Sequence, residues 1–499
     1  MSHNSNSNAQ VSNNSNLNKS KIGMFLGPLL AVAIYLLLGG VLPELPRRVA
    51  AAGTLMAVFW ICETMPLAAT ALLPVVLFPT LGILETEAAS APFAKPVIFL
   101  FLGGFLLAQA VEKCGLHRRL ALYILYLVGK KPGHLLAGLM GTSAFLSMWI
   151  SNTATVVMLV PIVGSLTMLL KPKLSCVQST NDLARFEIAL FLGVAYAASI
   201  GGMGTLVGTP PNAVLVGALE EIDISIGFGR WMLFALPFVF VYLAFLWWLL
   251  NRFLLPKSIR ALSIDTTMAG DELKKMGSIT RAEWTVCIVF VLAAASWILR
   301  EPLQNWNWLA TQLPFISRVT DASISITAAL LLFILPGNKS GDRILDWQTA
   351  NKLPWGVLVL IGGGMSLAAA MNESGLSQVV AEQLTVFQKL PTVVLIAIIA
   401  GFTIFLTEVT SNTATTATLL PVLAGLGSQL DCGPVALMIP AALAASCAFM
   451  LPVATPPNAV VFETGKIPMT TMMRYGLWLN LAGIVLITAV MVLLGGFMF

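Results

Sequence analysis

Apolar segments recur along nearly the whole chain, and most are long enough to cross a membrane as a helix. An α-helix rises about 1.5 Å per residue, so about 20 apolar residues span the ~30 Å hydrocarbon core. The pattern therefore predicts an all-α polytopic membrane protein with about eleven transmembrane helices. The predicted spans are about residues 24–42, 49–63, 67–83, 96–116, 187–219, 231–251, 283–299, 320–336, 355–376, 434–465 and 474–498.

Two further apolar stretches, about residues 134–170 and 391–429, are too long for a single crossing. Each carries the pentapeptide Ser-Asn-Thr-Ala-Thr near its centre, at residues 151–155 and 411–415. Because these side chains compete for backbone hydrogen bonds, the pentapeptide favours an interruption of the helix. Lysines gather on the cytoplasmic side of membrane proteins. The first stretch has lysines at both ends, namely Lys130, Lys131, Lys171 and Lys173.

The flanking charges predict that both stretches are re-entrant hairpins with the pentapeptides at their tips. The first hairpin is expected to enter from the cytoplasm. The second stretch has weakly charged ends, Lys389 and Asp431, and is expected to enter from the opposite face.

The two pentapeptides belong to an internal repeat. Ser151 and Ser411 are 260 positions apart, and glycine and proline pairs around them keep the same offset. Each copy is followed by Thr-Pro-Pro-Asn-Ala-Val, at residues 209–214 and 455–460. Proline lacks the backbone donor and breaks a helix. An odd number of predicted crossings separates the copies, so the repeat is inverted, an arrangement typical of secondary transporters.

The composition excludes a soluble domain. The chain has 499 residues, of which 57% are hydrophobic and 10% charged, and its mean hydropathy is +0.87. A soluble domain carries about 25% charged residues. The six cysteines are scattered and the three histidines do not cluster, so neither a zinc site nor a haem site is expected. No organic cofactor is expected.

Two further classes are excluded by the motifs that the chain lacks. It contains no HExxH, no phosphate-binding loop and no recognisable Ser/His/Asp set, so we do not expect an enzyme. No basic cluster is interleaved with aromatic residues, so nucleic acid is not an expected partner.

The distribution of positive charge predicts the orientation. With the N-terminus inside, most of the 28 Lys and Arg fall on the cytoplasmic side, and the largest group lies in the loop of residues 252–281. We therefore expect a cytoplasmic N-terminus and a periplasmic C-terminus. Residues 1–20 are rich in Ser and Asn and almost uncharged, which is typical of a disordered tail.

The chemistry of the predicted tips favours a cation-coupled carrier of anions. At a hairpin tip one half-helix presents free carbonyls, which suit an alkali cation, and the other presents free N–H groups, which suit a carboxylate. No Lys or Arg occurs in the tips or in the Thr-Pro-Pro-Asn segments. A bound dianion would therefore need cations. Glu408 lies three residues before Ser411, but its repeat equivalent is Met148, so it is not part of the shared machinery.

These motifs resemble the divalent anion:sodium symporter (DASS) family, and specifically its INDY-type bacterial sodium-dependent dicarboxylate transporters. The resemblance is carried by Met148 to Thr155 and by Ala444 to Asn458, and it covers nearly the whole chain after the tail. It implies a homodimer in the bacterial inner membrane, with scaffold domains and mobile transport domains that work by an elevator movement. It also implies Na+-coupled uptake of C4 dicarboxylates such as succinate, fumarate and malate.

The resemblance also implies site residues, including at least two Na+ sites. The first Na+ set would be Ser147, Ser151, Asn152 and Gly208, and the second Thr407, Ser411, Asn412 and Ala454. The substrate carboxylates would meet Asn152, Thr153, Asn412, Thr413, Thr455 and Pro456.

The expected domain organisation combines the repeat with the resemblance. Residues 21–131 would form scaffold helices of repeat 1, and residues 132–230 its transport elements, with a hairpin and a broken helix. Residues 231–390 would contain the remaining helix of repeat 1, a cytoplasmic linker and the scaffold helices of repeat 2. Residues 391–499 would form the transport elements of repeat 2 and the last helix.

Other functions of the same fold remain open at this point. One alternative is a Na+-independent dicarboxylate exchanger, and another is a carrier of citrate or of other divalent anions. An anion channel is less favoured, because a channel needs a continuous pore, whereas the polar groups here converge on one central site.

Overall fold

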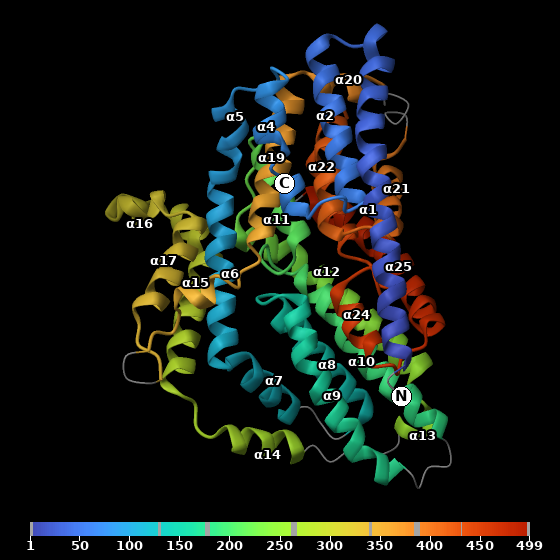
Figure 1. The fold of residues 1–499 in the computed structure, drawn as a ribbon. Coiled ribbons are helices and arrows are strands. Elements are labelled where there is room, and N and C mark those ends of the chain that lie inside the picture. Colours follow the sequence, from blue (N-terminus) through green and yellow to red (C-terminus); the bar gives the residue numbers. More distant parts are fainter. Residues whose placement is uncertain are drawn as a thin grey trace. The chain divides into compact units, whose positions relative to one another are not determined.

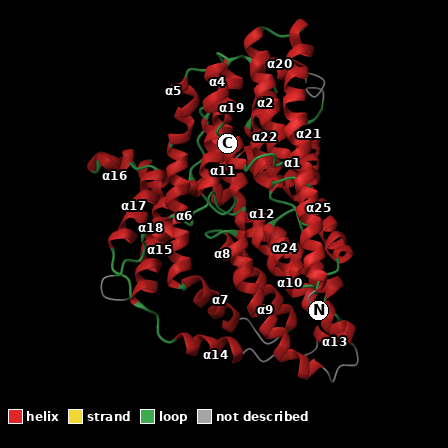
Figure 2. Ribbon diagram, viewed as in Figure 1, coloured by secondary structure: helices red, strands yellow, loops and turns green. Residues whose placement is uncertain are grey.

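The computed structural model describes residues 3–127, 131–174, 180–260, 267–338, 342–383, 390–430 and 432–496. Across these ranges the chain is built from helices (Figure 2), and the β pairing consists of one isolated bridge between Pro336 and Arg343. Seven described helices are long and apolar enough to cross a membrane, and five apolar helices are shorter. The predicted all-α polytopic class is confirmed.

Contacts divide the chain into two compact units, and each is described by itself. Unit 1 comprises Met1–Ile98, Ala213–Ser225 and Pro354–Ala445. Its helices are α1 (His3–Leu37), η1 (Leu38–Gly40), α2 (Glu44–Ile61), α3 (Leu67–Thr70), α4 (Leu73–Thr80), α5 (Thr86–Ser90), η2 (Ala91–Ala94), α19 (Trp355–Glu373), α20 (Leu376–Gln383), α21 (Thr392–Thr407), α22 (Asn412–Ser428) and α23 (Val435–Ala445).

Unit 2 comprises Phe99–Asn212, Ile226–Leu353 and Ser446–Phe499. Its helices are α7 (Leu116–Leu127), α8 (Pro132–Ser147), α9 (Asn152–Leu174), α10 (Thr180–Gly202), α12 (Phe228–Leu249), η3 (Leu250–Leu254), α13 (Lys257–Arg260), α14 (Thr267–Met276), α15 (Arg281–Gln304), α16 (Asn307–Gln312), η4 (Pro314–Arg318), α17 (Asp321–Ile334), α18 (Trp347–Ala350), α24 (Pro456–Glu463), α25 (Met469–Val490) and η6 (Met491–Gly495). Two helices, α6 (Pro96–Cys114) and α11 (Pro210–Glu220), pass from one unit into the other.

Both predicted helical hairpins are present, one in each unit. In unit 2, α8 and α9 contact each other and lie side by side (Figure 1). In unit 1, α21 and α22 form the equivalent pair. The bounds of α8 and α21 differ by 260 positions at both ends, so the offset of the pentapeptides extends over the whole first half of each hairpin.

The helices that carry Thr-Pro-Pro-Asn are interrupted, as the prolines predict. α10 ends at Gly202 and the chain becomes helical again at Pro210. α23 ends at Ala445 and α24 begins at Pro456. In both copies the first proline occupies the first helical position, where a missing N–H costs no intrahelical hydrogen bond.

The repeat continues past the motifs into the helix that follows each of them. α12 and α25 each have 22 residues, and their bounds differ by 241 positions at both ends. Each is followed by a single π-helical turn, η3 and η6. The two helices share little sequence pattern, so this correspondence emerges from the structure.

The core of unit 2 is built around α10. Residues 188–209 are all buried, and α10 contacts α8, α9, α12 and α24. A helix that is apolar on all sides is expected at the centre of such a bundle. α8 approaches it closely, since a Cβ atom at Gly201 would lie 2.3 Å from the Ala144 carbonyl oxygen. Glycine at position 201 is therefore required by packing.

Three charged residues used to predict topology lie outside the described residues: Lys130, Lys389 and Asp431. The predicted tail, residues 1–20, falls in α1, which begins at His3. The side chains of residues 1–19 also lie outside the described part of the chain.

Candidate functional site

The first hairpin tip comprises residues 148–151 and is closed by a contact between the side chains that flank it. α8 ends at Ser147 and α9 begins at Asn152. The Ser147 hydroxyl donates a hydrogen bond to Oδ1 of Asn152. Ser151 caps α9, because its hydroxyl accepts a 3.1 Å hydrogen bond from the Ala154 amide. The tip therefore presents neutral oxygens between the end of one helix and the start of another.

The Asn152 side chain lies against the loop between α10 and α11. A Cβ atom at Gly202 would lie 2.6 Å from Asn152 Oδ1, and one at Gly208 would lie 2.4 Å from the Gly202 carbonyl oxygen. Only glycine permits this approach. Thr205 ties the loop to the tip, because its hydroxyl donates to the Met148 carbonyl oxygen. The structure thus brings together, in unit 2, the predicted first Na+ set of Ser147, Ser151, Asn152 and Gly208.

The second tip has the same contact at the equivalent positions. α21 ends at Thr407 and α22 begins at Asn412. The Thr407 hydroxyl donates a 2.6 Å hydrogen bond to Oδ1 of Asn412. The same hydroxyl lies 3.1 Å from the Ala445 carbonyl oxygen at the end of α23. Here too, a hydroxyl, an amide oxygen and a carbonyl at a helix end converge.

A second pair of side chains crosses this tip. The hydroxyls of Thr410 and Thr415 lie 2.6 Å apart, so one donates to the other. Ser411 joins the two halves, and its carbonyl oxygen accepts a 2.8 Å hydrogen bond from the Thr415 amide. Three members of the predicted second Na+ set therefore lie within one tip in unit 1: Thr407, Ser411 and Asn412.

Both tips are partly open. Asn152 and Thr153 are half-buried, as are Asn412 and Thr413. Thr155, two residues after Thr153 in α9, is buried. A ligand group can therefore reach the first residues of α9 and α22, where free N–H groups and the positive end of the helix dipole favour an anion.

The asparagines of the two Thr-Pro-Pro-Asn segments brace the helix breaks. Asn212 Nδ2 donates a 2.8 Å hydrogen bond to the Thr205 carbonyl oxygen. Asn458 Nδ2 donates 3.1 Å hydrogen bonds to the carbonyl oxygens of Ala448 and Leu451. Both side chains are fully buried, and each Oδ1 has no hydrogen-bond partner among the described residues. These donations fix the amide orientation, so in each side chain the unpaired atom is the acceptor oxygen.

The second segment also positions Thr455 and Pro456. Thr455 caps α24, because its hydroxyl accepts a 3.3 Å hydrogen bond from the Asn458 amide. α24 packs against α9 and α10, so it lies beside the helix that starts at Asn152. Ala454 and Thr455 are buried, whereas Pro456 is exposed. All three belong to unit 2, whereas Thr407, Ser411, Asn412 and Thr413 belong to unit 1.

The tips are neutral apart from one carboxylate. Glu408 follows directly after α21 and is buried. Among the described residues no group of three or more His, Cys, Asp or Glu side chains is arranged to hold a metal ion. A cation at the tips would be met mainly by hydroxyl, amide and carbonyl oxygens. Such hard, neutral oxygens are suitable ligands for Na+.

Four residues of the site have no predicted role from the sequence motifs: Asn212, Asn458, Gly202 and Thr205. The two asparagines could have been identified from the sequence, because they occupy the same position in both copies of the repeated motif. The consecutive Gly201 and Gly202 signal a close backbone approach. Thr205 had no signal, because nothing in the sequence predicts its contact with the hairpin tip.

Comparison with known proteins places the chain among transporters. The family described as the sodium:sulfate symporter transmembrane region matches residues 23–499. The sodium-dependent dicarboxylate transporter SdcS of Staphylococcus saprophyticus is 41% identical over 485 residues, which covers 94% of this chain and 90% of that protein. The protein of the same name from Staphylococcus aureus is 40% identical over 475 residues, with the same coverage.

Two solved structures have a similar fold. The YdaH transporter of Alcanivorax borkumensis has a TM-score of 0.57 and 18% identity, covering 82% of this chain and 86% of that one. MtrF of Neisseria gonorrhoeae, described as one of a class of antimetabolite efflux pumps, has a TM-score of 0.55 and 15% identity. It covers 91% of this chain, and 96% of its own length is matched. At these identities the similarity concerns the fold alone.

Proposed function

The chain belongs to the sodium:sulfate symporter family, and from that premise we propose that it couples Na+ entry to the uptake of C4 dicarboxylates. The relatives named sodium-dependent dicarboxylate transporters support this proposal, because they are 40–41% identical over 94% of the chain. The proposed substrates are succinate, fumarate and malate.

The observation that carries the proposal is the matched contact at the two tips. Ser147 and Asn152 meet in one hairpin, and Thr407 and Asn412 meet in the other. In each pair a hydroxyl oxygen and an amide oxygen already lie within reach of one ion. A Na+ bound between them would be met by both oxygens once the hydroxyl proton turns away. The proposed sets are Ser147, Ser151, Asn152 and Gly208 for one ion, and Thr407, Ser411, Asn412 and Ala454 for the other.

The same arrangement accounts for coupling. A dicarboxylate carries two negative charges, and the tips contain no Lys or Arg. Without bound cations the charges would be offset only by helix N-termini and hydroxyls, each worth ~1 kcal/mol. Two Na+ ions would neutralise the dianion, so the substrate would bind tightly only after them. The proposed carboxylate partners are Asn152, Thr153, Asn412, Thr413, Thr455 and Pro456.

The proposed mechanism is an elevator movement within a homodimer in the bacterial inner membrane, with a cytoplasmic N-terminus and a periplasmic C-terminus. Support comes from the inverted repeat. In each copy a hairpin is followed by a broken helix and then by one further helix, α12 in the first copy and α25 in the second. Such repeats provide two related conformations for alternating access. Cross-linking of the purified protein and its mass in detergent test the dimer.

Succinate uptake into proteoliposomes tests the function. With K+ on both sides, uptake should be near background, and an inward Na+ gradient should drive accumulation of succinate above its external concentration. Linkage requires that succinate raise the affinity for Na+ by the same factor by which Na+ raises the affinity for succinate. Thermal stabilisation by succinate should therefore occur in Na+ and be absent in K+.

Three outcomes would contradict Na+-coupled uptake of C4 dicarboxylates, and each would identify a different function. Equal uptake in Na+ and K+ into vesicles preloaded with dicarboxylate would identify an exchanger. Citrate uptake with little succinate uptake would identify a carrier of another divalent anion. Fast, unsaturable equilibration without accumulation would identify a channel.

A further inference from the structure

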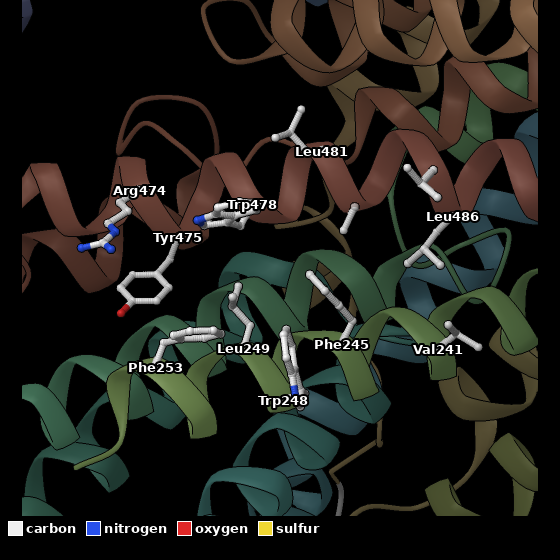
Figure 3. Close-up of a pocket in the computed structure, with 12 residues that line it drawn as sticks. Val241, Phe245, Trp248, Leu249, Phe253, Arg474, Tyr475, Trp478, Leu481 and Leu486 are labelled. Atoms are coloured by element: carbon white, nitrogen blue, oxygen red, sulfur yellow. The ribbon is translucent and has the colours of Figure 1, made fainter. Parts of the chain in front are cut away.

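Unit 2 contains an apolar groove that includes none of the residues proposed to bind Na+ or substrate. It lies between α12 and α25, has a volume of about 630 Å³, and is lined almost entirely by aliphatic and aromatic side chains (Figure 3). Trp248 and Phe253 are each 48% exposed, and Trp478 is 55% exposed. Exposed apolar surface on membrane-spanning helices faces lipid chains, and a groove in that surface can hold the chains of one lipid.

One end of the groove is polar and positively charged. Arg474, Tyr475 and Phe253 lie together at this end (Figure 3). Arg185 donates a 2.8 Å hydrogen bond to the backbone carbonyl oxygen of Phe253, and the Arg252 guanidinium lies 5.5 Å from the centre of the Phe253 ring. Two arginines therefore contact Phe253, and a third, Arg474, lines the same groove. Arg474 itself is exposed and forms no ion pair with any described carboxylate.

The internal repeat allows the charged end of the groove to be compared with its equivalent in the other copy. α12 and α25 are equivalent at an offset of 241 positions. Val241 and Ala482, which are equivalent, both line the groove, as do Phe245 and Leu486. Equivalent positions of the two helices therefore line the groove, so the two ends of the groove can be compared position by position.

The positions of α12 that are equivalent to the charged end of α25 carry no charge. The equivalents of Arg474, Tyr475 and Trp478 are Leu233, Phe234 and Pro237. An excess of arginine at the cytoplasmic end of a helix is common in membrane proteins. What distinguishes Arg474 is that it lines an apolar groove at this end and has no carboxylate partner among the described residues, so its charge is available to an anionic group.

We propose that the groove binds an anionic glycerophospholipid, with its phosphate at Arg474 and its acyl chains between α12 and α25. Arginine pairs with phosphate through two parallel hydrogen bonds, and a tyrosine hydroxyl can donate a third. Basic pockets between transmembrane helices on the cytoplasmic side are known sites for such headgroups. The charge distribution of the chain predicts that the ends of α12 and α25 that carry Phe253 and Arg474 face the cytoplasm.

A second groove provides a matched control. It lies between α12 and α15, has a volume of about 670 Å³, and also contains one arginine, Arg230. The Arg230 side chain lies 3.8 Å from the Glu301 carboxylate, so its charge already has a partner. Neutralising Arg230 should therefore leave lipid selectivity unchanged.

The test measures lipid binding to the delipidated, full-length protein in detergent, by native mass spectrometry and thermal stability. Wild-type protein should retain phosphatidylglycerol over phosphatidylcholine, and Arg474→Gln should lower that preference about tenfold, consistent with ~1 kcal/mol or more per basic residue near an anionic surface. Arg230→Gln should keep the preference. Ala482→Trp, which fills the groove where the helices cross, should reduce binding of both lipids.

Several results would overturn the proposal. An unchanged preference in Arg474→Gln would remove the headgroup site, and unchanged binding in Ala482→Trp would remove the groove. Equal stabilisation by inorganic phosphate or glycerol phosphate would show a free-anion site in place of a lipid site. A lipid-free dimer in which Trp478 is shielded from a fluorescence quencher would assign the groove to a second copy of the chain.

Discussion

The Thr407 hydroxyl donates a 2.6 Å hydrogen bond to Oδ1 of Asn412, so the last side chain of α21 holds the first side chain of α22. The Ser147 and Asn152 pair makes the same contact 260 positions earlier. A hydroxyl at the end of one half-helix and an amide at the start of the next thus define each tip.

Removing the Thr407 hydroxyl should weaken Na+ activation. Thr407→Val keeps the shape but removes an oxygen from the proposed second Na+ set, so the Na+ concentration for half-maximal succinate uptake should rise about tenfold, as for loss of a partner worth ~1.4 kcal/mol. Thr407→Ser should restore most of the affinity. Uptake is measured in proteoliposomes over a series of Na+ concentrations.

Thr488→Val is the control for this experiment. The Thr488 hydroxyl donates only to the Ile484 carbonyl oxygen of its own helix, at 2.7 Å, so its loss should not change Na+ activation. If Thr407→Val had the same Na+ dependence as wild-type protein, the second Na+ set would be wrong.

Replacing Asn458 with Ala should destabilise the break before α24. The substitution removes two hydrogen bonds and leaves the buried carbonyl oxygens of Ala448 and Leu451 without this donor. Each unsatisfied buried group costs ~1–3 kcal/mol. The melting temperature should fall markedly, whereas Asn351→Ala, at an exposed position, should leave it unchanged. Equal melting temperatures for both variants would contradict the bracing role.

Stability should depend on pH through Glu220, at the end of α11. The pKa of this carboxyl is raised to about 7, mainly because burial disfavours the charged form, with Lys95 lowering the pKa and neighbouring Glu221 raising it. The folded protein therefore keeps a proton that the unfolded chain releases near pH 4.5. The resulting stability is fully present below that pH and is lost as pH rises through about 7.

Glu220→Gln should remove this dependence. Melting temperatures measured between pH 4 and pH 8 should be similar for the two proteins at the acid end, and the variant should be the more stable above pH 7. Glu87→Gln, at an exposed position, serves as the control and should follow wild-type protein. Parallel curves for Glu220→Gln and wild-type protein would show that Glu220 does not titrate in this range.

Cysteine labelling should place the two hairpins on opposite faces of the membrane. In a background without native cysteines, a membrane-impermeant reagent should label Lys131→Cys and Lys173→Cys from the cytoplasm. It should label Leu390→Cys and Gln429→Cys from the periplasm. Only a hairpin puts both flanks of one apolar stretch on the same side. Labelling of the first two positions from opposite faces would convert the first hairpin into a full crossing.

The sequence by itself determined the helical class, the two hairpins and the two broken helices. These features depend on local chemistry: an apolar run of sufficient length forms a membrane helix, and Ser-Asn-Thr or Pro-Pro interrupts it. The constant offset between Ser151 and Ser411 then identified the repeat without any knowledge of contacts.

Only the tertiary structure decided which side chains meet. The Thr205 contact with Met148 and the Asn458 contacts with Ala448 and Leu451 depend on how a loop folds back, which no periodicity encodes. The equivalence of α12 and α25 was hidden because packing preserved their lengths while their side chains diverged. Arg474 and Phe253 are far apart in the chain but line the same groove, because helix packing, and not sequence proximity, brings their helices together.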